Sequence, residues 1–155
     1  MKVINEINFE YYNTRSSAQS FLNRIIGEGK AELLDAVLTD MYPDGIKESE
    51  LDDILDYEEE DVCKWLDMRT ESDVRSDIRD KEAEIEDAED SIKELEEEIA
   101  SWERELYEDE DADTDDIQSK IDELNSDINT YRDDIEAYTE ELDELREELD
   151  DILSY

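Results

Sequence analysis

The stretch EDEDADTDD, residues 108–116, holds seven carboxylates in nine positions and contains neither glycine nor proline. On both sides of it, apolar residues recur in steps of three and four, the spacing typical of a coiled coil. Before the stretch, these positions are Val74, Ile78, Lys81 (an exception), Ile85, Ala88, Ile92, Leu95, Ile99, Trp102 and Leu106. After it, they are Ile117, Ile121, Leu124, Ile128, Tyr131, Ile135, Tyr138, Leu142, Leu145, Leu149 and Ile152.

The two sets of positions mirror each other about residues 111–112. If the chain reverses there, every position of the first set faces one of the second, from Leu106 opposite Ile117 to Val74 opposite Leu149. A continuous helix does not require this relation, although two heptad phases coincide by chance about one time in seven. We therefore expect an antiparallel helical hairpin.

The acidic stretch itself admits three interpretations: a bend, a disordered tract or a calcium loop. Asp113 or Thr114 supplies an N-cap for a second helix, which favours the bend. In a calcium loop that starts at Asp109, Thr114 would occupy the glycine position and Lys120 the position of the bidentate glutamate. A start at Asp111 fits no better, so we expect a bend near 109–114 and no dedicated metal site.

Composition supports an ordered helical protein. The 155 residues include 54 Asp and Glu against 15 Lys and Arg, which gives a net charge of -39. Such a charge favours disorder, but 37% of the residues are hydrophobic and they are regularly spaced. With only 3 Gly and 1 Pro, the chain is suited to helices. The expected fold is mainly α: a small helical (α+β) N-terminal head followed by a long antiparallel coiled-coil hairpin.

The sequence changes character near residues 69–70, which sets the expected domain boundary. Residues 1–70 hold 17 acidic and 7 basic side chains, a net of −10. Residues 71–155 hold 37 acidic and 8 basic side chains, a net of −29. We therefore expect a head at 1–70 and an acidic hairpin at 71–155, which rests on the head or on a second copy of the chain as a homodimer.

The head shows shorter elements. Its expected elements are a strand at Lys2–Phe9, a helix from Ser16 or Ser17 that Gly27 and Gly29 stop, a helix at Ala31–Met41, a turn at 42–45, a helix capped by Ser49 through Leu51, Ile54 and Leu55, and a short helix with Val62, Trp65 and Leu66. The last two resemble a helix-turn-helix over about 20 residues, although two packed core helices fit equally. A DNA-reading helix begins with polar or basic residues, whereas here Glu58, Glu59, Glu60 and Asp61 would repel DNA.

Several classes of function lack the residues they need. The chain has 1 Cys, Cys63, and no His, so no disulfide and no Cys/His zinc site can form within it, and Cys63 has no histidine to activate it as a nucleophile. The segment GEGK at 27–30 lacks the spacing of a phosphate-binding loop. We expect a protein that is not an enzyme and uses no cofactor.

Charge and hydropathy also limit the location and the partners. The N-terminus has no apolar signal region and no apolar run reaches membrane length. We expect a cytoplasmic protein that binds neither membranes nor nucleic acid directly, because both are anionic. A partner with a basic surface fits better.

The charge density of the expected hairpin is close to that of DNA. Arms of about 37 residues span about 55 Å, so a net of −29 corresponds to about 0.5 negative charge per Å. B-DNA carries about 0.6 per Å. A coiled coil that needed only solubility would intersperse Lys with Glu for i,i+4 pairs. The acidity therefore favours mimicry of nucleic-acid phosphates, with salt adaptation as a further interpretation.

A short, His-free, strongly acidic chain with a small head and an acidic helical rod resembles the DNA-mimic inhibitors of phages and other mobile elements. These include anti-CRISPR and anti-restriction proteins. The segment MYPDGIKESELDDILDYEEEDVCKWLDM, residues 41–68, is similar to small acidic proteins of unknown role carried by mobile elements of gut Gram-positive bacteria. The resemblance implies an inhibitor of a basic defence nuclease, with the RNA-guided nuclease of a type II CRISPR system as the first expectation.

The expected contacts with such a partner are outward carboxylates. They are Glu58, Glu59, Glu60 and Asp61 in the head, Glu94, Glu97, Glu98 and Glu105 in the first arm, Asp109 and Asp111 in the bend, and Asp133, Asp134, Glu140 and Glu144 in the second arm. A different class of function remains open, that of a structural or adaptor coiled coil that joins proteins without mimicking DNA.

Overall fold

The computed structural model describes residues 3–4, 9, 12, 14 and 16–155. Contacts divide the chain into two compact units, Met1–Arg75 with Glu148–Tyr155, here called the head unit, and Ser76–Glu147, here called the hairpin unit. This division differs from the expected one because residues 71–75 and 148–155 group with the head. Within the head unit, Arg69 Nη1 lies 2.9 Å from a Glu148 carboxylate oxygen and the Ser20 hydroxyl donates to the main-chain oxygen of Tyr155.

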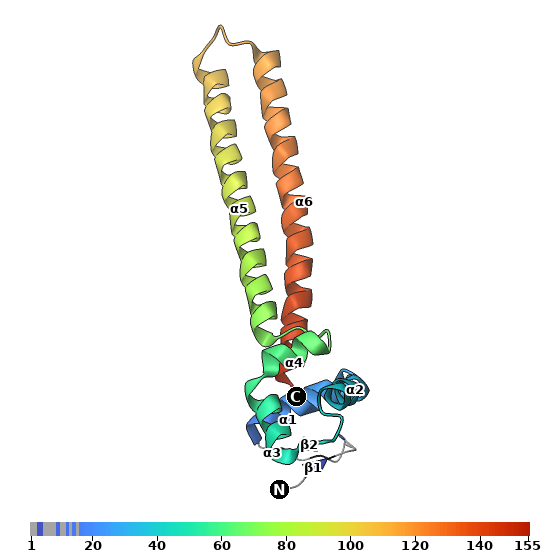
Figure 1. Ribbon diagram of the computed structural model, residues 1–155. Coiled ribbons are helices and arrows are strands. Elements are labelled where there is room, and N and C mark those ends of the chain that lie inside the picture. Colours follow the sequence, from blue (N-terminus) through green and yellow to red (C-terminus); the bar gives the residue numbers. More distant parts are fainter. Residues whose placement is uncertain (1–2, 5–8, 10–11, 13, 15) are drawn as a thin grey trace. The chain divides into compact units, whose positions relative to one another are not determined.

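Among its described residues, the head unit contains four complete helices and one pair of very short strands (Figure 1). The bounds are β1 Val3–Ile4, α1 Ser16–Gly27, α2 Ala31–Met41, β2 Ile46–Lys47, α3 Glu48–Tyr57 and α4 Glu59–Trp65. The strands are antiparallel, with Val3 paired to Lys47 and Ile4 to Ile46. The four expected helices are confirmed. Of the expected strand at Lys2–Phe9, Val3–Ile4 is a strand, and residues 2 and 5–8 lie outside the described residues.

The expected cap in the head needs correction, and α3 and α4 fit the second of the two interpretations offered for them. The cap at Ser49 is wrong: α3 begins at Glu48, directly after β2, and Lys47 occupies the N-cap position. The Lys47 main-chain N–H donates to the Glu50 carboxylate at 3.4 Å. Helices α3 and α4 are joined by Glu58 alone, whereas a helix-turn-helix uses a turn of three or four residues. They are packed core helices.

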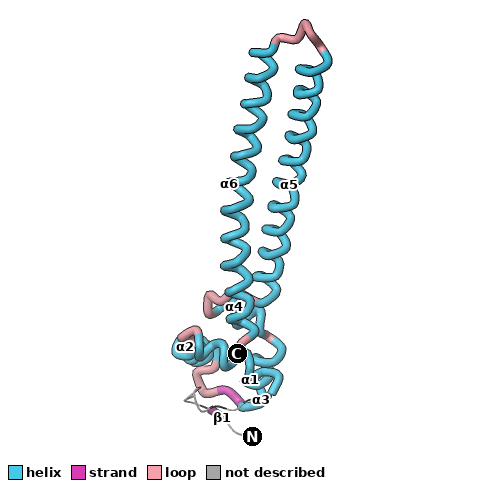
Figure 2. The backbone as a smooth tube through the Cα atoms, turned by 180° about the vertical axis from the view of Figure 1, so that it is seen from behind, coloured by secondary structure: helices cyan, strands magenta, loops and turns pink. Residues whose placement is uncertain are grey.

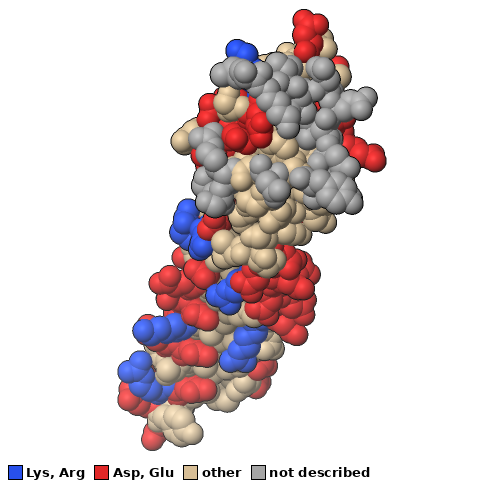
Figure 3. Space-filling view, turned by 90° about the horizontal axis from the view of Figure 1, so that it is seen from below, with Lys and Arg blue, Asp and Glu red and all other residues tan. Residues whose placement is uncertain are grey.

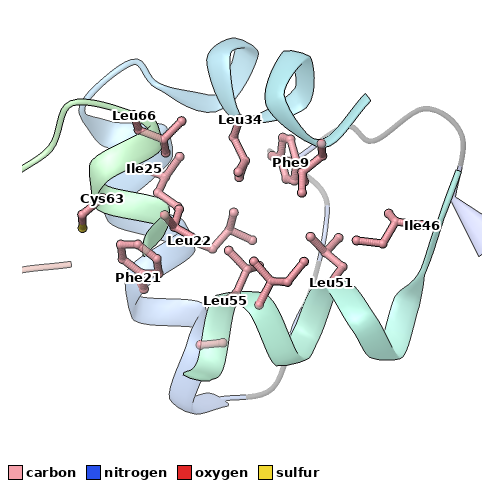
Figure 4. Packing of buried hydrophobic residues seen from close by; sticks show 14 residues of the cluster. Phe9, Phe21, Leu22, Ile25, Leu34, Ile46, Leu51, Leu55, Cys63 and Leu66 are labelled. Carbon is pink, nitrogen blue, oxygen red and sulfur yellow. The ribbon is translucent and has the colours of Figure 1, made fainter. Parts of the chain in front are cut away.

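The head unit has a continuous apolar core. It comprises Phe9, Ala18, Phe21, Leu22, Ile25, Leu34, Leu38, Ile46, Leu51, Ile54, Leu55, Val62, Cys63 and Leu66. Figure 4 shows the side chains of Leu22, Leu34 and Leu55 directed toward one interior. Each helix contributes closely spaced residues to this core, so that each buries one apolar face and exposes its polar face.

Glycine is required where α1 ends. Gly29 has φ 73°, and the Lys30 N–H that follows donates to the Ile25 carbonyl at 2.9 Å, which closes the helix. Gly27 is close to the ring of Tyr155, and a Cβ at position 27 would overlap that ring. Both glycines therefore end α1 as the sequence indicates, and Gly27 also admits a chain segment far away in sequence.

The hairpin unit is formed by parts of α5 (Glu71–Glu108) and α6 (Thr114–Leu153), which run side by side in Figures 1 and 2. Every heptad position predicted between residues 76 and 147 is buried or half-buried. Lys81 Nζ contacts Glu141 at 2.5 Å, and Lys120 Nζ lies 4.3 Å from the centroid of the Trp102 ring. The mirror relation pairs Lys81 with Leu142 and Trp102 with Ile121, so each observed contact lies one residue from its predicted pair. The antiparallel hairpin is confirmed.

Lys81, the exception in the heptad pattern, is stabilised by its neighbours. Its ammonium group bonds to Glu84 at 2.7 Å and Glu141 at 2.5 Å and lies 4.8 Å from the centroid of the Tyr138 ring. The hydrogen bonds to Glu141 and Glu84 raise the pKa of Lys81. The lysine therefore stays charged and packs its stem along the seam between the helices.

Candidate functional site

Nearly all acidic side chains of the hairpin unit face solvent. Residues 76–147 hold 32 Asp and Glu against 7 Lys and Arg, a net of −25. Thirty-one of the 32 are exposed, and Asp134 is half-buried. Figure 3, which views the whole molecule from below, shows Asp and Glu in broad patches and Lys and Arg in separate groups. With arms of about 36 residues and about 54 Å, the density is about 0.5 negative charge per Å, close to that of B-DNA.

The structure exposes 13 of the 14 predicted contact residues, and Asp134 is the exception. Glu59, Glu60 and Asp61 lie in the first turn of α4, where their negative charges interact favourably with the positive end of the helix dipole. Glu94 and Asp134, on different helices, line one hollow. The head residues and the hairpin residues belong to different units, and each set is a surface of its own unit.

The sequence predicted a set of partner-binding carboxylates, and the ion pairs observed within the hairpin unit involve other carboxylates. Ion pairs join its cations to Glu82, Glu84, Glu96, Asp116, Glu141 and Asp143. None of these is a predicted contact. The predicted carboxylates of the hairpin unit, exposed except for the half-buried Asp134, thus form no ion pair with a cation from the described part of the chain.

Carboxylates in the loop between α5 and α6 bond to the main chain. Asp113 Oδ1 accepts from the Asp116 N–H at 3.1 Å and so caps α6, while Asp109 Oδ1 accepts from the Asp111 N–H at 3.0 Å. Of the two predicted caps, Asp113 is the one used. Within the described residues, no group of three or more Asp, Glu, Cys or His side chains is arranged to hold a metal ion.

The head unit has an acidic hollow of about 410 Å³ that the sequence did not reveal. It joins the predicted contacts Glu59 and Glu60 to Glu71, Asp73 and Asp56. A capping box, in which the Asp73 N–H bonds to the Thr70 hydroxyl at 3.0 Å and Asp73 accepts from the Thr70 N–H at 3.2 Å, begins α5. The T-x-x-D spacing was the available signal for that helix start, but not for its approach to α4.

Arg24 is a second feature that sequence reasoning missed. Its side chain is buried, with Nε 3.0 Å from a Glu28 carboxylate oxygen and Nη2 bonded to the main-chain oxygen of Arg69. The Glu28 contact is an ion pair but not an aligned hydrogen bond, since Nε and Nη1 have no hydrogen-bond partner among the described residues. Arg24 thus ties α1 to the residues that precede α5.

Cys63 is a core residue and not a nucleophile in this structure. It is 1% exposed, and burial raises the pKa of its thiol to about 11, with Arg24 opposing and Glu59 and Glu28 adding to the rise. Because the thiolate is the nucleophilic form, the folded protein holds Cys63 unreactive at neutral pH.

This burial predicts slow modification and a specific loss of stability in alkali. We expect a chromogenic disulfide reagent at pH 8 to modify folded Cys63 at least about 100-fold more slowly than the unfolded chain, because both access and thiolate are reduced. The raised pKa contributes stability below pH 9 that is lost as pH rises through about 11, of the order of 2–3 kcal/mol. A Cys63→Ala variant should lack this component of the pH dependence. Equal reaction rates for folded and unfolded protein would contradict the burial.

Comparison with protein-family models, curated proteins and solved structures gives no match to this chain. Among the described residues, no helix combines the length and the apolar character needed to cross a membrane. Function is therefore inferred from the chemistry of the surface.

Proposed function

We propose that the protein is a non-enzymatic inhibitor that mimics nucleic-acid phosphates and occupies the basic DNA-binding channel of a bacterial defence nuclease. The observation that carries this proposal is the outward array of carboxylates on the hairpin unit, with a net charge of −25 on residues 76–147. Its linear charge density, about 0.5 per Å, is near that of a duplex.

The hairpin supplies this charge on a stable scaffold. Helix α5 has 38 residues and α6 has 40, and their shared seam keeps the carboxylates on the outer faces. A preorganised array loses less conformational entropy on binding than a flexible acidic chain does. Its carboxylates would form charge-assisted hydrogen bonds with the Arg and Lys residues that otherwise bind phosphates.

The first target we propose is the RNA-guided nuclease of a type II CRISPR system. Such nucleases read a short motif beside the target with arginine side chains and hold nucleic acid in a positively charged channel. Carboxylates engage arginine with the same bidentate geometry as phosphate. The inhibitor would act in the cytoplasm of the bacterium that contains the nuclease.

A competition experiment tests the proposal. Guide-loaded nuclease is bound to a labelled duplex that carries the target and its motif, and the protein is titrated at 50 mM and 200 mM salt. We expect release of the duplex at low salt, and direct binding of the protein to the nuclease about tenfold or more weaker at 200 mM, because ion pairs are screened by salt. Polyglutamate of equal net charge, -39, is the matched control and should compete less well, since its charges are not preorganised.

Two results would count against mimicry. A duplex that stays bound at low salt, with this nuclease and with basic restriction nucleases, would contradict it. Binding of the protein to the nuclease without release of DNA would instead support the adaptor function, in which the hairpin joins proteins.

A further inference from the structure

The hairpin unit has a hollow of about 530 Å³ across its two helices. It is lined by Ser91, Glu94 and Leu95 of α5 and by Asp127, Thr130, Tyr131 and Asp134 of α6. The volume is in the range of ligand pockets. The lining combines a half-buried aromatic ring and a half-buried leucine with three carboxylates, which suits a side chain with an apolar stem and a cationic end.

One heptad away, the same hairpin holds a cation in a matching arrangement. Lys81 lies over the Tyr138 ring and bonds to Glu141 and Glu84. A shift of seven residues along each helix replaces Tyr138 by Tyr131, Glu141 by Asp134, Glu84 by Ser91 and Lys81 by Ala88. The heptad around Tyr131 therefore repeats the ring and one carboxylate but has an alanine where the lysine stands.

A second ring on the hairpin also carries a cation. Lys120 Nζ lies 4.3 Å from the centroid of the Trp102 ring and 3.3 Å from an Asp116 carboxylate oxygen. A cation over a ring is favourable because the ring face is electronegative, and an adjacent carboxylate adds to the attraction. The unit thus uses a cation, an aromatic ring and a carboxylate together at two positions.

The carboxylates at the hollow lack such a cation within the described chain. Glu94, Asp127 and Asp134 form no ion pair among the described residues. Asp134 is also half-buried, unlike the other acidic residues of the hairpin unit. A partly desolvated carboxylate without a cation gains more from a new ion pair than an exposed one does.

We propose that this hollow accepts an arginine side chain of the basic partner, placed over Tyr131 and bonded to Asp134 and Asp127. The inference rests on the proposed function and makes one part of the hairpin a specific contact within a broad acidic surface. Arginine fits better than lysine because the acidic residues lie three and four positions on either side of Tyr131 in α6. A planar guanidinium with five donors reaches carboxylates on both sides while stacking on the ring.

The test uses the full chain and a nonapeptide of alternating arginine and glycine, with the lysine counterpart as comparison. Calorimetry gives the affinity, and NMR reports the Tyr131 ring signals. We expect the arginine peptide to shift those signals and to bind at least about threefold more tightly than the lysine peptide. Asp127→Asn with Asp134→Asn should weaken binding about 10–100-fold, and Tyr131→Leu about 3–30-fold.

A matched variant separates a specific site from diffuse attraction. Glu123→Gln with Glu136→Gln removes the same charge from exposed positions of α6 outside the hollow, and should weaken binding less than about threefold. Ala88→Lys should place a lysine over Tyr131, as Lys81 lies over Tyr138, and abolish binding at the ring. Circular dichroism verifies that each variant is helical, and the surface pair keeps the test valid if Ala88→Lys does not fold.

Three results would overturn the assignment. They are equal weakening of binding by the two double variants (Asp127→Asn with Asp134→Asn, and Glu123→Gln with Glu136→Gln), unshifted Tyr131 signals, and equal affinity for the lysine peptide. These outcomes can be distinguished from failure of the proposed function. If the nuclease does not release its DNA but the arginine peptide still binds at Tyr131, mimicry fails and the arginine site stands. If Asp127→Asn with Asp134→Asn releases DNA as well as Glu123→Gln with Glu136→Gln does, the arginine site is contradicted and the proposed function stands.

Discussion

Replacement of six outward carboxylates of the hairpin unit by amides is expected to weaken inhibition of the nuclease about 100-fold. The six are Glu97, Glu98, Glu105, Asp133, Glu140 and Glu144, all exposed. None forms an ion pair with the described residues. An exposed pair with a partner contributes about 0.5 kcal/mol, so six lost pairs amount to about 3 kcal/mol, or two powers of ten. The measurement is the concentration of protein that releases half of the duplex.

The chain offers a control with the same loss of charge. Glu82, Glu84, Glu96, Asp116, Glu141 and Asp143 already pair with cations of the hairpin. Their conversion to amides should weaken inhibition about tenfold or less, while it destabilises the helices by removing the internal pairs. The first set should instead stabilise the hairpin, because it removes only repulsion. Unchanged inhibition by the first set would contradict the proposed contact surface.

The second large effect is expected in the core of the head unit. Leu34→Ala should lower the free energy of unfolding by about 2–5 kcal/mol, because it removes a fully buried side chain and leaves a cavity among close-packed neighbours. This is a large part of the 5–15 kcal/mol that stabilises a typical domain. Denaturant unfolding monitored by near-ultraviolet circular dichroism measures the loss.

Its neighbour provides the control. Leu33 lies on the same helix, α2, and is 42% exposed, so Leu33→Ala should cost less than about 1 kcal/mol. The two variants share composition and helix propensity and differ only in what the leucine touches. Equal losses for the two would show that α2 does not pack as the structure places it.

Much of this architecture could be predicted from periodicity. The apolar steps of three and four defined both long helices, and the mirror relation about 111–112 predicted their antiparallel register. The apolar spacing and the turn at 42–45 predicted α2 at its observed bounds, and the glycines predicted that α1 ends at Gly27. These signals succeed because helix formation, capping and amphipathicity depend on residues within a few positions of one another.

The sequence by itself determined the hairpin, the helical head and the outward acidic surface, because each follows from local spacing and composition. Only the tertiary structure decided that residues 148–155 join the head unit, that Arg24 is buried, and that Glu71 and Asp73 line a hollow with Glu59. It also decided that Asp134 is half-buried beside Tyr131, whereas the heptad pattern placed it outward. These features depend on contacts between residues far apart in the chain, and on the depth of the groove between two packed helices, neither of which periodicity encodes.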